Sequence, residues 1–191
     1  MFFMKTGSGK KIVAISKIIL KTLLGIGVAV SIITLPGLAH ILKLFEEDKK
    51  YKRKFDKEIY RLKKTGFIKI YDRSGINFVK LTKEGQKVAK KYEIDDIKIK
   101  KTPKWDGKWR IVVFDIPEDK KYARKGLRIK LNDLGFLLYQ KSVFVHPYEC
   151  KDEINFVANY YNIKKYLKYI TADAIEDQEN LIRYFNLRQH I

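Results

Sequence analysis

The sequence predicts an α+β fold in two parts: helices that end in a β-hairpin, followed by a region of β-α-β-β-α-β order. Apolar residues recur at helical spacing in the first part and gather in β-rich runs in the second. The net positive charge also falls between the two parts: residues 1–104 hold 26 basic and 10 acidic side chains, whereas residues 105–191 hold 15 basic and 12 acidic ones. Since 191 residues suffice for two small domains, we expect a helical domain over 1–92, a short connection over 93–104 and a second domain over 105–191.

The amino-acid composition indicates which kinds of molecule the protein binds and which kinds of protein it cannot be. A net charge of +19 indicates a polyanion, either nucleic acid or an acidic membrane surface. Hydrophobic residues make up 46% of the chain, which is too many for a disordered basic tail. The single cysteine, Cys150, excludes a disulfide framework and a Cys-rich zinc site and fits a reducing compartment, so we expect a cytoplasmic protein.

The apolar segment Thr22–Leu42 allows two interpretations. Its 21 residues contain no Lys, Arg, Asp or Glu and are long enough to cross a bilayer, which would make the chain a membrane-anchored basic DNA-binding protein. Alternatively, two buried helices, about Ile12–Thr34 and Gly37–Glu47, meet at Pro36-Gly37. We favour the buried helices, because the DNA-binding fold predicted below needs a helix at Ile12–Thr34 to complete its core.

The stretch Lys49–Lys64 predicts an amphipathic helix with a basic outer face. Phe55, Ile59 and Leu62 form its apolar stripe, and the acidic Glu58 falls to one side. The side opposite the stripe carries only basic residues, which are Lys50, Arg53, Lys57, Arg61 and Lys64. Like charges at this spacing destabilise a helix, and a phosphate backbone would relieve their repulsion. The alternative is an ordinary solvated, lysine-rich helix face.

A hairpin and a further helix follow the basic helix. Phe67–Tyr71 and Ile76–Leu81 are predicted as strands around the turn-forming tetrad Asp72-Arg73-Ser74-Gly75. Gly66 can end the preceding helix in a left-handed conformation, and Thr82 can cap a helix that runs to Tyr92.

This order of elements is typical of a winged helix-turn-helix. In that fold the basic helix enters the major groove of duplex DNA, and the hairpin tip reaches a neighbouring stretch of backbone. The predicted contacts to double-stranded DNA are therefore Lys50, Arg53, Lys57, Arg61 and Lys64 on the helix and Arg73 on the hairpin tip.

The second half alternates strands and helices in the ferredoxin-like βαββαβ order. The predicted elements are a strand over Trp109–Asp115, a helix over Pro117–Leu134, two strands within Phe136–Tyr148 that turn near Lys141-Ser142, a helix over Lys151–Tyr161, a strand over Lys165–Ala172 and a short helix over Asp177–Phe185. We therefore expect a winged helix-turn-helix followed by a ferredoxin-like domain.

Two stretches of this half resemble the central domain of the PaaX family. They are Trp109-Arg110-Ile111-Val112-Val113-Phe114-Asp115-Ile116-Pro117-Glu118, and Leu134-Gly135-Phe136 followed by Gln140-Lys141-Ser142-Val143-Phe144-Val145. PaaX proteins are repressors in which a winged helix precedes a domain similar to the small CRISPR-associated endonuclease Cas-two. The resemblance spans roughly residues 40–172 and implies a DNA-binding repressor that dimerises through its ferredoxin-like domain. PaaX repressors carry a further C-terminal domain to which no part of the resemblance extends, so we do not carry over their acyl-CoA effector binding.

The resemblance also raises one catalytic alternative, a metal-dependent endonuclease. In the Cas-two family the aspartate that ends the first strand meets its symmetry mate and holds a divalent metal, and Asp115 is the matching residue. Two Asp115 carboxylates would suit Mg²⁺. The structural alternative is that Asp115 caps the helix that starts at Pro117-Glu118. His40, His146 and His190 are scattered without metal-ligand spacing, so we otherwise expect neither catalytic residues nor a cofactor.

Overall fold

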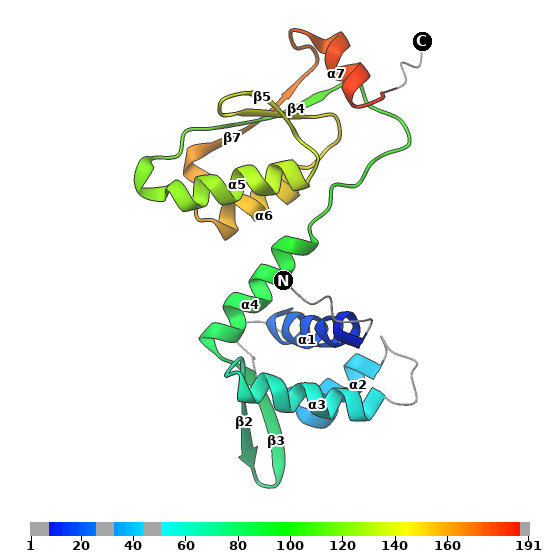
Figure 1. The fold of residues 1–191 in the computed structure, drawn as a ribbon, viewed down its shortest axis with the longest axis vertical. Coiled ribbons are helices and arrows are strands. Elements are labelled where there is room, and N and C mark those ends of the chain that lie inside the picture. The colour runs from blue at the N-terminus through cyan, green and yellow to red at the C-terminus, as the bar shows by residue number, and fades with distance from the viewer. Residues whose placement is uncertain (1–7, 26–32, 44–50, 188–191) are drawn as a thin grey trace, which may run out of the picture. The chain divides into compact units, whose positions relative to one another are not determined.

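The computed structural model describes residues 8–25, 33–43 and 51–187 and divides into two compact units, Met1–Asp95 and Asp96–Ile191 (Figure 1). The described elements of the first unit are α1 (Ser8–Gly25), β1 (Ile33–Thr34), α2 (Leu35–Lys43), α3 (Tyr51–Lys64), β2 (Ile68–Arg73), β3 (Ile76–Leu81) and α4 (Lys83–Asp96). The three strands form an antiparallel sheet in the order β1-β3-β2. The last helix, α4, runs four residues beyond Tyr92 and so enters the predicted connection.

The helices of the first unit share one core with its sheet. The buried members of this core are Ile15, Ile19, Leu20 and Leu23 of α1, Leu38 of α2, Phe55, Ile59 and Leu62 of α3, Ile68, Val79 and Leu81 of the hairpin, and Ala89 of α4. The predicted apolar stripe of α3 is confirmed, because all three of its members are buried. Helix α1 supplies a third of the buried positions, which explains why the hairpin and α3 need a helix before them.

The predicted helix Ile12–Thr34 is wrong at its C-terminal end. Helix α1 ends at Gly25, and Ile33 and Thr34 form the short strand β1, which pairs with Val79 and Phe78 of β3. The β-branched side chains of Ile33 and Thr34 favour an extended backbone, and the open edge of β3 supplies their hydrogen-bond partners. Residues 26–32 lie outside the described part of the chain. Within the described ranges, no helix is long and apolar enough to cross a membrane.

Glycines end α3 and close the hairpin, as the sequence predicts. The backbone of Gly66 has a φ of +74°, and the Phe67 N–H donates to the Leu62 carbonyl, so α3 stops in a left-handed cap. At the hairpin tip, Ser74 and Gly75 have φ values of +54° and +77°, the pattern of a two-residue primed turn. The turn is therefore shorter than the predicted tetrad, because Arg73 already pairs with Ile76 in the sheet.

The start of α4 is capped by Thr82 and packs against the backbone that follows α3. The Thr82 hydroxyl oxygen accepts a hydrogen bond from the Gly85 N–H at 3.0 Å, which confirms the predicted cap. Gly85 lies so close to the Phe67 carbonyl that a Cβ there would sit 1.9 Å from its oxygen. Only glycine fits this position, because the start of α4 packs directly against the backbone that links α3 to β2.

The second unit has the β-α-β-β-α-β order that the sequence predicts. Its elements are β4 (Trp109–Phe114), a 3-10 turn (Glu118–Lys120), α5 (Lys121–Asp133), β5 (Leu137–Gln140), β6 (Val143–His146), α6 (Lys151–Tyr160), a 3-10 turn (Lys164–Tyr166), β7 (Leu167–Ala172) and α7 (Gln178–Tyr184). The sheet is antiparallel throughout, with the order β5-β6-β4-β7, which places β4 in its interior.

Both faces of this sheet are covered at β4. Helices α5 and α6 lie over one face, and α7 lies against the other (Figure 1). Trp109 and Val145 pack with Leu181 of α7 on the second face. Since side chains alternate along a strand, Val112 and Phe114 point to the helix-covered face. This double burial explains the nearly continuous apolar run of β4.

Candidate nucleic-acid interface

Helix α3 presents most of its cations to solvent. We call the set Arg53, Lys57, Arg61 and Lys64, with their neighbours Lys52 and Lys63, the α3 basic face; all six residues are exposed. The side chains that oppose them pack into the core of the first unit. Lys50, the remaining predicted contact on this helix, lies outside the described residues. The contact roles of these residues stay predictions.

A buried carboxylate lies beneath this face. Glu58 lies beside the apolar stripe and away from the basic outer side, as expected, but it is 2% exposed and therefore buried, which the sequence did not predict. It follows Phe55 by three residues and sits only about 60° from the centre of the apolar stripe. The Ser16 hydroxyl of α1 donates a hydrogen bond to Glu58 Oε1, which offsets part of the cost of burying the charge. The carboxylate therefore ties α3 to α1.

Arg61 completes this cluster from the solvent side. Its Nε donates to Glu58 Oε1 at 2.8 Å, and its Nη2 donates to the same oxygen and, at 2.6 Å, to the Ser16 hydroxyl. The hydrogen bond to Glu58 raises the pKa of the Arg61 guanidinium. Nη1 has no hydrogen bond to any described residue, so one edge of the guanidinium remains open to a phosphate. Arg61 thus has a structural role, and it differs from Arg53 and Lys57, whose side chains have no such bonds to other described residues.

The hairpin carries the last predicted contact. Arg73 is exposed and occupies the final pair of the ladder, opposite Ile76. Asp72 accepts a hydrogen bond from the Gly75 N–H at 3.3 Å and so stabilises the turn. The hairpin therefore holds Arg73 at a defined position beside a rigid tip.

Asp115 lies just beyond β4, at the place the sequence predicts. Its N–H donates to the Tyr166 carbonyl at 3.0 Å, whereas its exposed carboxylate has no partner within the described ranges. The 3-10 turn that starts at Glu118 has no side-chain cap, so the predicted capping role is wrong. No three His, Cys, Asp or Glu side chains of the described residues converge on a metal position. Within the described residues a single chain therefore supplies one carboxylate here, so a metal held by Asp115 would take its other ligands from water, from a substrate or from a second chain.

A polar network that sequence reasoning missed surrounds the buried Arg110 at the other end of β4. Arg110 is 4% exposed and donates to Asp106, to the carbonyls of Lys108 and Pro147 at 2.7 and 2.9 Å, and to Glu149 at 3.3 Å. The hydrogen bonds to Asp106 raise the pKa of the guanidinium. All three nitrogens of the Arg110 guanidinium donate to groups of the second unit, so this buried residue stabilises the fold.

His146 and Cys150 beside this network are structural. Burial lowers the pKa of His146 to about 4, and its Nδ1 accepts the Tyr148 N–H at 3.1 Å. Burial also raises the pKa of the Cys150 thiol to about 12, which removes the thiolate needed for nucleophilic chemistry. Neither group is therefore poised for catalysis at neutral pH.

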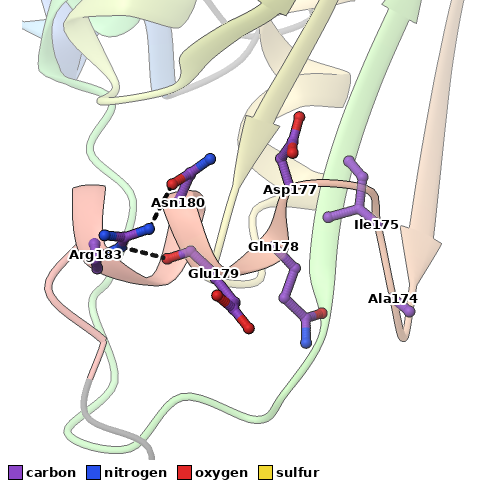
Figure 2. A pocket seen from close by; sticks show the side chains of 7 residues that line it. All are labelled: Ala174, Ile175, Asp177, Gln178, Glu179, Asn180 and Arg183. Atoms are coloured by element: carbon purple, nitrogen blue, oxygen red, sulfur yellow. Dashed lines mark hydrogen bonds between the residues drawn. The ribbon is translucent and has the colours of Figure 1, made fainter.

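The segment around α7 lines an open pocket of about 420 Å³ (Figure 2). The lining residues are Ala174, Ile175, Asp177, Gln178, Glu179, Asn180 and Arg183. Arg183, their one cation, donates to the Asn180 side chain at 2.7 Å and to the Glu179 carbonyl at 3.4 Å, as the dashed lines in Figure 2 show. The two carboxylates of the lining, on Asp177 and Glu179, repel phosphate, so this pocket is unsuited to nucleic acid.

Comparison with known proteins concerns the second unit. No curated protein is significantly similar to the chain. Residues 102–182 match the family model described as the PaaX protein central Cas2-like domain. The match spans every strand of the second sheet and most of α7. The second unit is therefore similar to the central domain of PaaX proteins, as the two sequence stretches in β4 and around β5 and β6 predict.

Proposed function

We propose that this chain is a PaaX-type transcriptional regulator whose first unit binds duplex DNA as a winged helix-turn-helix. The observation that carries the proposal is the α3 basic face, a row of exposed cations on a helix fixed by its opposite, buried side. The hairpin that follows would serve as the wing, with Arg73 near its tip. The PaaX-like second unit supports a regulatory role.

The salt dependence of binding tests the interface. If each chain of a dimer makes about four phosphate contacts, log K should fall with log salt at a slope of roughly −7. The variant Arg53→Ala/Lys57→Ala should bring the slope to about half that value, because it removes about four of the eight contacts. Arg61 is left intact in this variant, because its removal would leave the buried Glu58 carboxylate without its cationic partner and could destabilise the fold.

A matched variant controls for net charge. Lys125→Ala/Lys141→Ala removes the same charge from exposed positions of the second unit and should leave the slope unchanged. Fluorescence anisotropy with a labelled duplex over a series of salt concentrations gives all three slopes. An unchanged slope in Arg53→Ala/Lys57→Ala would refute the α3 basic face as the DNA contact.

We further propose that the regulator is a repressor that dimerises through its second unit, on the strength of the PaaX-like match. A dimeric regulator selects two half-sites related by its own symmetry. Selection from a random duplex pool at physiological salt should therefore enrich a palindrome. The absence of any enriched sequence would contradict specific regulation.

A second candidate function, metal-dependent nucleic-acid cleavage, is favoured by one observation. The Asp115 carboxylate is exposed and lacks a partner among the described residues, so it is free to bind an ion shared with a second chain. Incubation of the dimer with Mg²⁺ or Mn²⁺ and single- or double-stranded substrates tests this function. Cleavage that Asp115→Ala abolishes would support it, and cleavage that persists in this variant would exclude Asp115.

A further inference from the structure

The β2–β3 hairpin has two chemically different faces. Its pairing places Ile68 opposite Leu81 and Ile70 opposite Val79, and these four residues pack into the core of the first unit. Because side chains alternate along a strand, the intervening pairs point the other way. We call these pairs the outer face of the hairpin: Lys69 with Lys80, Tyr71 with Phe78, and Arg73 with Ile76.

The outer face combines aromatic rings with unopposed positive charge. Tyr71 is 43% exposed and Ile76 is 49% exposed, and Phe78 is half-buried. The three cations of the outer face are exposed. The one acidic residue of the hairpin, Asp72, alternates to the opposite face and is bound to the turn. No carboxylate of the hairpin therefore opposes a polyanion on this face.

We propose that the outer face of the hairpin binds unpaired DNA, with a base stacked on Tyr71 and the adjoining phosphates beside Lys69, Lys80 and Arg73. The inference rests on the proposed function, since it takes DNA as the partner. Cations alone would suffice for the backbone of a fully paired duplex, whose bases are already stacked on one another. An exposed ring between cations adds affinity only for a base outside the stack, and such stacking platforms are typical of single-strand binding surfaces.

The spacing and anchoring of the residues on the outer face of the hairpin also suit unpaired DNA. Residues two apart on one strand lie about 7 Å from each other on the same face, so cations stand on both sides of the Tyr71–Phe78 pair along the ribbon. The next pair of the ladder, Ile70 with Val79, lies on the inner face and packs into the core, so it fixes the backbone beside Tyr71 and Phe78. The platform is thus fixed before the base arrives, which lowers the entropy lost on binding.

The test compares a paired duplex with the same duplex carrying four unpaired thymines at its centre. The full chain should bind the second DNA more tightly. Tyr71→Ala should weaken that binding by about 5- to 150-fold, the range expected for the loss of one stacked base. Affinity for the paired duplex should change less than about twofold. Tyr71→Phe keeps the ring and should retain the preference.

A spectroscopic readout and a control separate stacking from damage to the fold. A 2-aminopurine in the unpaired stretch should be quenched by the wild-type chain and by Tyr71→Phe, but not by Tyr71→Ala. Tyr122→Ala removes a still more exposed tyrosine, 81% exposed, from the second unit and should behave like the wild type. Equal losses on both DNAs in Tyr71→Ala, or no loss on either, would overturn the inference while leaving duplex binding intact as a function. Failure of the wild type to bind either DNA would contradict both proposals.

Discussion

Each unit contains an arginine–carboxylate cluster, but the two clusters bury opposite charges. In the first unit the Glu58 side chain is 3% exposed, whereas Arg61 above it is 45% exposed. In the second unit Arg110 is 5% exposed, whereas its partners Asp106 and Glu149 are 49% and 59% exposed. The first cluster therefore offers a cation to solvent and the second offers two carboxylates. Of the two surfaces, only the first is suited to phosphate.

This inversion determines which partner matters more for stability. A buried charge that loses its partner remains desolvated and uncompensated, whereas a half-exposed charge that loses its partner is rehydrated. The cost of a substitution should therefore be highest when it removes the exposed partner and leaves the buried one. The predictions on Arg61 and Asp106 test this rule, one in each unit, and the prediction on His146 tests a buried neutral group of the second unit; they run from the largest expected effect to the smallest.

The substitution Arg61→Ala should destabilise the first unit by about 3 kcal/mol or more. It leaves the Glu58 carboxylate in the core with Ser16 as its one remaining partner among the residues described. Lys57→Ala, on the exposed side of the same helix, is the matched control and should change stability by less than about 0.5 kcal/mol. Hydrogen–deuterium exchange of core amides in α1 and β3, followed by mass spectrometry, measures the first unit separately. Equal effects of the two variants would show that Glu58 is not held as a buried charge.

Acidification should act on the second unit through His146. Its folded pKa of about 4 lies below the ordinary value near 6.5, because burial disfavours the charged ring. Between these two values the unfolded chain binds a proton that the folded chain excludes, so stability falls as the pH drops from about 6.5 to 4. The loss should reach at most about 3 kcal/mol.

The chain's two tryptophans make this measurement specific. Trp105 and Trp109 both belong to the second unit, so urea unfolding followed by tryptophan fluorescence reports that unit alone. His146→Gln should remove most of the loss between pH 6.5 and about 5, above the range in which ordinary carboxylates titrate. A wild-type stability that stays constant from pH 6.5 to 4 would contradict the burial of a neutral His146.

The sequence predicted those parts of the molecule that local patterns determine. The amphipathic stripe of α3, the glycine stop at Gly66 and the order of strands in the second unit each depend on spacings within a few residues. Strand β1 was missed, because a two-residue strand has no periodicity and is formed by pairing with β3.

The buried charges were missed for a related reason. Glu58 meets Ser16 across 42 positions of sequence, and the partners of Arg110 include Glu149, 39 positions away. The helical angle of Glu58, close to the apolar stripe, was the one available signal. In the same way, the sequence shows which residues of β2 and β3 alternate, but only the register of the two strands shows that Tyr71 lies opposite Phe78.

The smallest effect expected from the comparison is that of Asp106→Ala in the second unit. It removes the bidentate partner of the buried Arg110, but the guanidinium keeps the Lys108 and Pro147 carbonyls and the Glu149 carboxylate. The cost should therefore be about 2 kcal/mol, below that of Arg61→Ala, which leaves Glu58 a single partner.

A control variant at a neighbouring acid, Asp173, distinguishes the loss of the Arg110 partner from the loss of one negative charge. Asp173, whose side chain is 89% exposed, lies 3.7 Å from the Lys108 ammonium, and such surface pairs contribute little. Asp173→Ala should consequently change the free energy of unfolding by less than about 0.5 kcal/mol, again followed through tryptophan fluorescence in urea. Equal losses in Asp106→Ala and Asp173→Ala would mean that the two carbonyls and Glu149 satisfy Arg110 without Asp106. The two units would then differ in more than the sign of the buried charge, because the first would depend on Arg61 whereas the second would not depend on Asp106.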